Sequence, residues 1–195
     1  YHLQAEEALQ TIPNLQFVVL RTAIVYAPGD VTGIAPRLIA AATYVQMKTK
    51  MELLWDKEMR INTVHVRDVC KAILLAGDKA PAKSVFNLCD KNGTDQGTVN
   101  KHIEAIFKIK TGFHGTMLST VAKTNLEGVV EGANEKHLKP WSDICKEHGI
   151  LNTPLTPYLD VELMSNNQLS VDGSKIERDL GFSYDLPQMS LEEVR

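Results

Sequence analysis

The sequence predicts an α/β fold, namely the C-terminal part of a doubly wound parallel sheet with a smaller, mostly helical subdomain. Short apolar runs rich in β-formers alternate with stretches of helical periodicity as far as Ile109, which is typical of βαβ units. After about Gly112 the pattern becomes mostly helical. The chain also begins at Tyr1 inside a helical pattern with no start signal, so we expect it to be the C-terminal part of a longer protein.

The first half of the chain supplies two expected helices and three expected strands. Apolar residues recur at helical spacing over residues 1–10 and again over 36–49. Residues 16–20 form an apolar run bounded by turn signals, which predicts a buried, parallel strand. Two further strands are expected at 51–55 and at 61–66, where apolar and polar residues alternate.

The next elements continue the alternation of helix and strand. We expect Asp68 to be the N-cap of a helix over 69–76, because its carboxylate can accept a free backbone N–H of the first turn. A strand over 84–88 and a helix over 98–109 follow, separated by a polar loop. The stretch 116–149 has helical periodicity and few β-type runs.

These patterns divide the chain into two expected units. Residues 1–111 form the sheet-containing unit, and residues 112–195 form a mostly helical subdomain with a C-terminal tail. The tail carries a short helix over 174–180 and a last helix from Ser190.

Composition excludes several classes of protein. The 195 residues carry 21 Lys and Arg against 24 Asp and Glu, a net charge of −3, so nucleic acid and anionic membranes are not expected partners. No apolar run approaches the roughly 20 residues of a membrane span. The 3 cysteines are irregularly spaced, which favours a reducing, cytoplasmic compartment. The 6 histidines lack metal-ligand spacing, so no metal site is expected.

Four segments together resemble one family. They are Leu20-Arg-Thr-Ala-Ile-Val-Tyr-Ala-Pro-Gly-Asp30, Val64-His-Val-Arg-Asp-Val69, Val85-Phe-Asn-Leu88, and a tail with Ser174-Lys175, Leu180-Gly-Phe182 and Ser190-Leu-Glu-Glu193. In order and spacing they resemble the C-terminal part of the extended short-chain dehydrogenase/reductases, the NAD-dependent epimerase/dehydratase family. The resemblance covers 1–109 and 169–195, whereas 110–168 matches no pattern of the family.

The resemblance implies a Rossmann-type sheet and NAD or NADP as the cofactor. It also implies that residues 1–111 belong to the NAD(P)-binding domain, with interleaved substrate-side segments, and that the helical subdomain of 112–195 lies on the substrate side. The family holds the dinucleotide on a Gly-rich turn after its first strand, where the backbone approaches the phosphates closely. This chain has no such turn. We therefore expect the turn upstream of Tyr1, and we expect the isolated 195 residues to bind NAD or NADP poorly.

The resemblance also suggests catalytic and cofactor-binding residues. The family uses Tyr-x-x-x-Lys, in which Tyr is the general acid/base and Lys lowers the Tyr pKa and holds the cofactor ribose. In the favoured register His2 takes the Lys position and can still bind the ribose; Tyr1 as the catalytic Tyr, or neither residue, are the alternatives. Thr22, Ala23 and Ile24 lie where the family backbone meets the nicotinamide, or they simply end a strand.

Three residues are candidates for substrate binding. Arg60 lies near the position at which relatives acting on nucleotide sugars place a phosphate-binding Arg, and Arg37 is a similar candidate; both can instead be solvated. Tyr26 either contacts substrate or packs in the core. Arg21 is expected to be structural and paired with a carboxylate such as Glu6.

Three functions remain open. The favoured one is an NAD(P)-dependent oxidoreductase, epimerase or dehydratase that transfers hydride at a carbinol or carbonyl of a small or nucleotide-sugar-like substrate. The alternative is a pseudoenzyme, which the altered Lys position and Ile24 in place of the family's Asn both favour. A third is an interaction role for 116–149. By resemblance alone, a homodimer through the first helix is possible.

Overall fold

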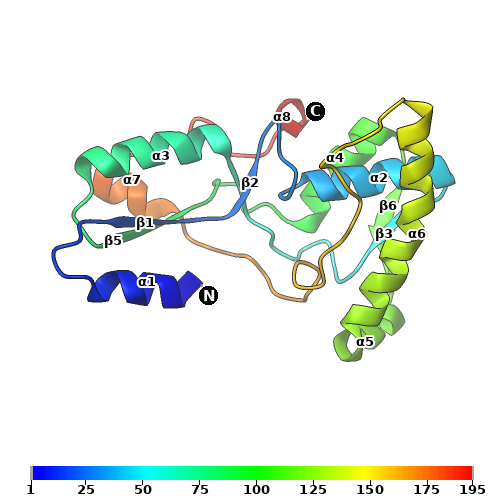
Figure 1. Cartoon of the computed structure of the whole chain (residues 1–195), viewed down its shortest axis with the longest axis horizontal. Coiled ribbons are helices and arrows are strands. Elements are labelled where there is room, and N and C mark those ends of the chain that lie inside the picture. Colours follow the sequence, from blue (N-terminus) through cyan, green and yellow to red (C-terminus); the bar gives the residue numbers. More distant parts are fainter. Residues whose placement is uncertain (1, 195) are drawn as a thin grey trace.

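The computed structural model describes residues 2–194, and they form two lobes (Figure 1). The sheet lobe contains α1 (His2–Thr11), β1 (Val18–Thr22), α3 (Val66–Lys79), β5 (Ser84–Leu88) and α7 (Ser174–Leu180). The helical lobe contains α2 (Ala35–Met47), β3 (Met51–Leu53), α4 (Gln96–Phe107), β6 (Thr111–Phe113), α5 (Thr116–Thr124) and α6 (Leu126–Glu147). Between the lobes lie β2 (Ile24–Tyr26), β4 (Thr63–His65) and α8 (Leu191–Val194).

All three strand pairs of the described residues are parallel. β1 pairs with β5, β2 with β4, and β3 with β6. Parallel neighbours require a crossover connection, and here helices α2, α3 and α4 lie in those connections. The predicted α/β class with parallel strands is confirmed, although the sheet is divided into three two-stranded pieces.

One extended segment joins the lobes. The chain leaves β1 at Thr22, and the Ala23 N–H donates to the Leu88 carbonyl at 2.8 Å. The Ile24 N–H then donates to the Asn62 carbonyl at 3.0 Å, and β2 begins. The apolar run expected as a strand over 16–20 therefore continues in extended conformation to Tyr26, because the chain finds a second parallel partner after Thr22.

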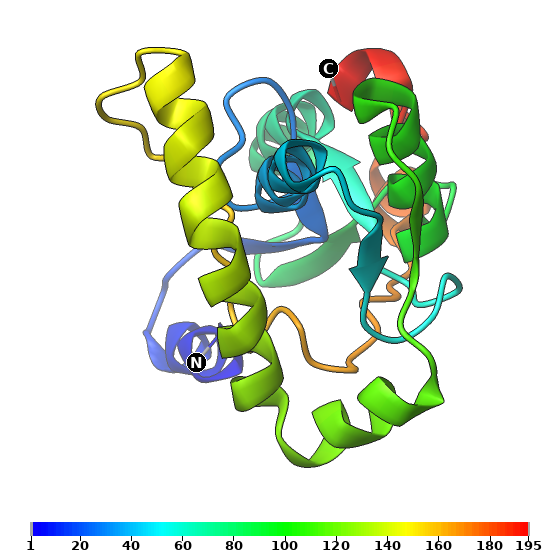
Figure 2. The same ribbon diagram turned by 90° about the vertical axis from the view of Figure 1, so that its right-hand side faces the viewer.

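Each lobe has its own apolar core. In the sheet lobe Phe86, Leu88 and Ile176 are almost fully buried, and α3 and α7 pack on the β1–β5 pair. In the helical lobe Ala41 and Ile103 are fully buried, and α6 packs along α2. Figure 2 shows α6 lying across α2 in the foreground.

The start of α3 differs from the prediction. The helix begins at Val66, and its N-cap is His65, whose Nδ1 accepts the Arg67 N–H at 3.2 Å. Asp68 lies inside the first turn and is 1% exposed. Its carboxylate instead accepts the backbone N–H groups of Asp185 and Leu186, at 2.7 and 3.1 Å. The N-cap prediction for Asp68 is wrong because the carboxylate is used to fix the C-terminal tail.

Most other predicted elements are confirmed with small shifts at their ends. The first helix, the helices near 36–49, 98–109 and 174–180, and the helical stretch 116–149 all form. Strand β6 was not expected from the sequence. The predicted pairing of Arg21 with Glu6 is confirmed by two hydrogen bonds of 2.9 and 2.6 Å.

The segment from 150 to 172 crosses from the helical lobe back to the sheet lobe (Figure 1). Leu169 bridges Ile61 in parallel, and the Val171 N–H donates to the Asn62 side chain at 2.9 Å. Each lobe thus contains segments from both sides of the expected boundary at 111/112, and that boundary stays a prediction. Of the helices described, none is both long and apolar enough to span a membrane.

Candidate functional site

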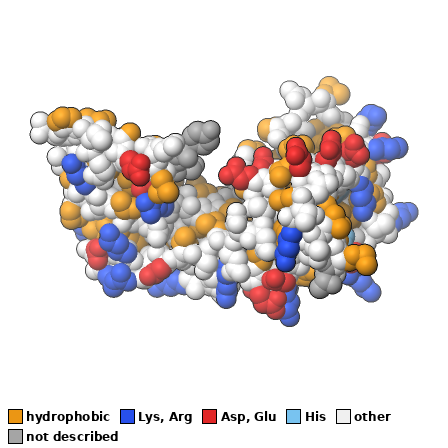
Figure 3. Space-filling model, turned by 90° about the horizontal axis from the view of Figure 1, so that it is seen from below, with side chains coloured by type: hydrophobic (Ala, Val, Ile, Leu, Met, Phe, Trp, Pro, Cys, Tyr) orange, Lys and Arg blue, Asp and Glu red, His pale blue; other side chains and the backbone are white. Residues whose placement is uncertain are grey.

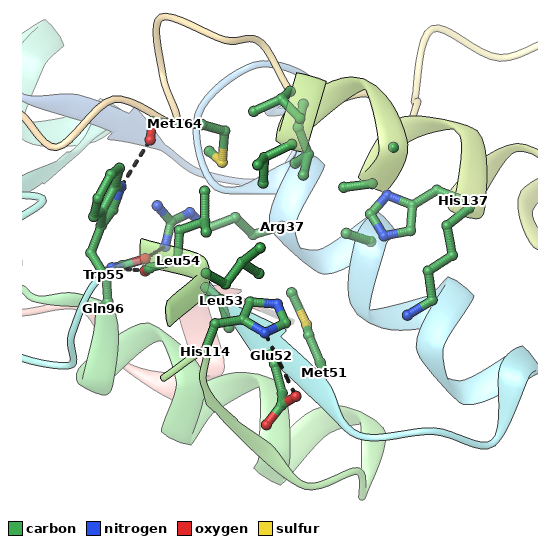
Figure 4. A pocket seen from close by; sticks show the side chains of 18 of the residues that line it. Arg37, Met51, Glu52, Leu53, Leu54, Trp55, Gln96, His114, His137 and Met164 are labelled. Atoms are coloured by element: carbon green, nitrogen blue, oxygen red, sulfur yellow. Dashed lines mark hydrogen bonds and ion pairs between the residues drawn. The ribbon is translucent and has the colours of Figure 1, made fainter. Parts of the chain in front are cut away.

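A cavity of about 410 Å³ lies in the helical lobe, between α2, β3 and α6 (Figure 4). Its size falls in the range of small-molecule sites. Most of its wall is apolar and includes Met51, Leu53, Leu54, Met59 and Leu163. We take it as the candidate substrate site.

Trp55 forms one wall of the cavity at the end of β3. Its φ angle is 69°, a left-handed conformation that is unusual for a bulky residue and that turns the chain away from the strand. The indole N–H donates to the Met164 carbonyl at 2.9 Å, which ties the crossing segment to this wall.

Arg37 is the cation at one end of the cavity. It lies on α2, and its Nη1 donates to Oε1 of Gln96 at 3.2 Å. The Gln96 amide N–H groups donate to the carbonyls of Leu54 and Asp56, both at 3.1 Å, so the amide oxygen must face Arg37. Burial lowers the pKa of Arg37 to about 10, which leaves it charged at neutral pH. No carboxylate pairs with it among the described residues.

His137 lies at the opposite end of the cavity from Arg37 (Figure 4). It is 2% exposed, and neither ring nitrogen completes a hydrogen bond within the described part of the chain. Burial lowers its pKa, an effect that the Pro157 carbonyl partly opposes. Its ring meets Tyr44 edge-on at 5.4 Å, and the Lys136 ammonium lies 4.7 Å from the Tyr44 ring centroid.

The third polar group of the wall is an ion pair near β3. The Glu52 carboxylate lies 3.0 Å from the Lys50 ammonium and 3.8 Å from Nδ1 of His114. The hydrogen bond from Lys50 is the main cause of a lowered Glu52 pKa. Glu52 thus neutralises the nearby lysine.

The predicted substrate residues are not brought together. Arg37 lines the cavity, whereas Arg60 lies outside its lining and donates to the Gly93 carbonyl. Tyr26 borders a second, smaller cavity of about 210 Å³ together with Glu193 of α8. Its hydroxyl is buried without a hydrogen-bond partner among the described residues, and burial is the main cause of its raised pKa.

The predicted cofactor residues lie at the end of β1. Thr22 is exposed there, whereas Ala23 is 5% exposed and packs in the sheet-lobe core. Ile24 packs against the other core. Tyr1 lies outside the described residues, and of His2 only the backbone, at the start of α1, is described. On the face shown in Figure 3 the surface is hollowed between the two lobes.

A comparison with known protein families gives a match over one segment of the chain. Residues 2–89 match the NAD dependent epimerase/dehydratase family. The resemblance expected from the sequence motifs is therefore confirmed over this segment. A comparison with curated proteins finds no match.

Solved structures of two epimerases and of a third enzyme share the fold. The UDP-glucose 4-epimerase of Thermotoga maritima, crystallised with UDP-glucose, is 21% identical with a TM-score of 0.54, over 98% of this chain and 48% of that one. The Bordetella bronchiseptica enzyme WbmF, in complex with NAD+ and UDP, is 14% identical with a TM-score of 0.52, over 98% and 46%. An epimerase of Methanothermobacter thermautotrophicus is 13% identical with a TM-score of 0.57, over 98% and 45%. This chain thus spans about half the length of these structures.

The epimerase/dehydratase segment supplies only one side of the cavity. Arg37, Trp55 and the β3 wall lie within residues 2–89, whereas Gln96, His114 and the α6 wall lie beyond it. The sequence did not single out Gln96 or His137 as site residues. No local motif marks Gln96, because its partners are backbone carbonyls about 40 residues away. His137 was noted only for lacking a metal-ligand spacing. Among the described residues no group of three or more His, Cys, Asp and Glu side chains could hold a metal ion.

Proposed function

We propose that the protein is an NAD(P)-dependent oxidoreductase, epimerase or dehydratase that transfers hydride at a carbinol or carbonyl of a small or nucleotide-sugar-like substrate. The observation that carries this proposal is the half-buried Arg37, which faces a largely apolar cavity without a carboxylate partner. The epimerase/dehydratase match over residues 2–89 supplies the reaction class.

The residues at the end of β1 partly fit a dinucleotide. Thr22 is exposed at the carboxyl end of a parallel strand, the edge at which doubly wound sheets bind their ligands. The N–H groups of Ala23 and Ile24 are already used in strand hydrogen bonds, so contact there would be through Thr22. NAD or NADP, when bound, supplies the hydride chemistry.

The chain's own residues would bind and orient the substrate. Arg37 would hold an anionic group of the substrate, and Gln96 would fix the guanidinium in place. The apolar walls would exclude water, which strengthens such charged contacts. His2, at the family's Lys position, would donate to the cofactor ribose, and a Tyr would transfer the proton. Tyr1 is the alternative candidate for that Tyr.

The alternative proposal is a pseudoenzyme that keeps the fold as a dinucleotide-binding or protein-interaction module. One observation favours it. The family pattern has Asn where this chain has Ile24, and the Ile24 side chain packs against an apolar core, so it can make no polar contact with a substrate.

A cofactor titration of the full-length protein separates the two proposals. We expect NADH or NADPH fluorescence to shift on binding, and cofactor bound to the enzyme to be reduced or oxidised when a substrate is added. Thr22→Trp fills the end of β1 and should weaken cofactor binding at least about tenfold, whereas Thr124→Trp at the exposed end of α5 should not. Cofactor binding without any turnover supports the pseudoenzyme. Binding of neither cofactor contradicts the enzyme and the dinucleotide-binding form of the pseudoenzyme, and favours the protein-interaction module.

Two secondary proposals concern the compartment and the oligomeric state of the protein. The three cysteines are free thiols, which supports a reducing, cytoplasmic compartment. A homodimer through α1 is also proposed; α1 is mostly exposed, and sedimentation of the full-length protein would test the dimer.

A further inference from the structure

We infer that the cavity binds a substrate with a flat apolar body and a single anionic group, not a nucleotide diphosphate. This inference rests on the proposed function, because it takes the helical-lobe cavity as the substrate site. Three features of the wall support it. Arg37 has unused hydrogen-bond donors, the other cations already have partners, and few polar groups of the wall are free to bind a ligand.

Arg37 has unused hydrogen-bonding capacity. A guanidinium carries five N–H donors. One hydrogen bond, to Gln96, is made by Arg37 in the described part of the chain. A partly buried cation without a carboxylate is costly unless a ligand pairs with it. A carboxylate or phosphate on the substrate would supply that partner and could bind in a bidentate manner.

The remaining cations of the wall are already engaged. Lys50 pairs with Glu52 at 3.0 Å, and Lys136 lies over the Tyr44 ring. His114 faces the same carboxylate of Glu52 at 3.8 Å. A diphosphate would therefore find one free cation among the described lining residues, which matches one anionic group.

The wall offers little that could recognise a nucleobase. The Gln96 amide N–H groups are both used by the Leu54 and Asp56 carbonyls. Elsewhere the wall is mostly made of Leu, Met, Val and Ala side chains with the Trp55 indole, whose N–H is bound to Met164. The His137 imidazole, at the far end from Arg37, also belongs to the wall, and its nitrogens complete no hydrogen bond among the described residues. One imidazole cannot pair with all the polar edges of a nucleobase. Such a surface favours an apolar, aromatic body, because base edges would lose their hydrogen bonds to water without replacement.

Calorimetry on the full-length protein with four probes tests this inference. We expect cinnamate to bind about tenfold more tightly than cinnamamide, its neutral counterpart, because only the acid pairs with Arg37. Phenyl phosphate in place of cinnamate shows whether carboxylate or phosphate is preferred. UDP should bind more weakly than both aromatic anions.

Variants assign the effect to Arg37. Arg37→Gln should remove the preference for cinnamate over cinnamamide, and Arg37→Lys should keep part of it. Arg67→Gln is the matched control, because the Arg67 side chain is 65% exposed and does not line the cavity. Urea unfolding of each variant would verify that it is folded.

Three outcomes would overturn the inference: UDP binding most tightly, equal affinity for cinnamate and cinnamamide, or no binding of any probe by folded protein. These outcomes are separate from failure of the proposed function. Cinnamate binding that depends on Arg37, in a protein that ignores both nicotinamide cofactors, would support the cavity and contradict the dehydrogenase chemistry.

Discussion

The two lobes differ in how completely their buried polar groups are satisfied. In the sheet lobe, buried Asp68 accepts two backbone N–H groups, and the Tyr184 hydroxyl behind it donates to the Gly173 carbonyl. Within the described residues, every buried side-chain polar atom without a partner lies in the helical lobe or in the segments around β2 and β4. They belong to Tyr26, Asn62, Asn100, His102 and His137. The Nε2 atom of His65 completes no hydrogen bond but lies 3.1 Å from the Glu193 carboxylate.

This contrast indicates which lobe is specialised for stability and which for ligand binding. Buried polar groups are normally hydrogen-bonded, so a cluster of exceptions marks a place that folding alone does not explain. In the sheet lobe the buried polar groups form hydrogen bonds within the fold, and these bonds stabilise it. In the helical lobe one of these residues, His137, lines the main cavity, where a ligand could pair with its imidazole.

The largest expected effect is the loss of the Phe86 side chain from the sheet-lobe core. Phe86 is 1% exposed, and Phe86→Ala should lower the free energy of unfolding by about 4 kcal/mol through lost burial and a new cavity. Leu53→Ala, at the wall of the existing cavity, should cost less than half as much. Urea unfolding measures both; equal losses would remove the distinction between the lobes.

A smaller effect is expected at Asp68. Asp68→Ala leaves the N–H groups of Asp185 and Leu186 without their acceptor and should cost about 3 kcal/mol in unfolding free energy. Asp68→Asn keeps one acceptor oxygen and should cost less. If the two variants lose the same stability, the carboxylate does not act through those two hydrogen bonds.

The smallest effect is expected at His137, a buried group whose one polar neighbour, the Pro157 carbonyl, does not complete a hydrogen bond with it. His137→Leu should leave the unfolding free energy within about 1 kcal/mol of the wild type at pH 7, or raise it. A loss of more than about 2 kcal/mol would mean that the Pro157 carbonyl is a full hydrogen-bond partner of His137.

The pH dependence sharpens this prediction. Because burial lowers the His137 pKa below its ordinary 6.5, the unfolded chain takes up a proton at a pH where the folded one does not. Stability is then complete above pH 6.5 and falls as the pH is lowered through that value. His137→Leu should reduce this slope, and His148→Leu, at an exposed position, should not. Part of the slope should remain, since burial also lowers the pKa of His102.

The sheet lobe could be predicted well from the sequence, whereas the site could not. Alternating apolar runs and helical spacing are local signals, and they predicted β5 and α7 of the sheet lobe closely, as they did α2 of the helical lobe. Asp68 was placed at a helix start by the same local logic, but its partners are in the tail more than 100 residues away. Gln96 was not predicted as a site residue for the same reason, because the backbone carbonyls that it binds are about 40 residues away in the sequence. Arg37 was named from resemblance and chemistry, and only the structure showed that its guanidinium lacks a carboxylate.

The parallel pairing of the strands has a consequence for how the chain folds. Val18 pairs with Ser84, Ile24 with Thr63 and Met51 with Thr111, so no strand can pair until several tens of residues of chain have been brought back to it. Closing such loops costs entropy before any contact compensates for it, and proteins rich in distant contacts fold slowly. The helices of residues 116–147 need no such closure. In a refolding experiment helical circular dichroism should therefore recover before the burial of Phe86 in the sheet-lobe core.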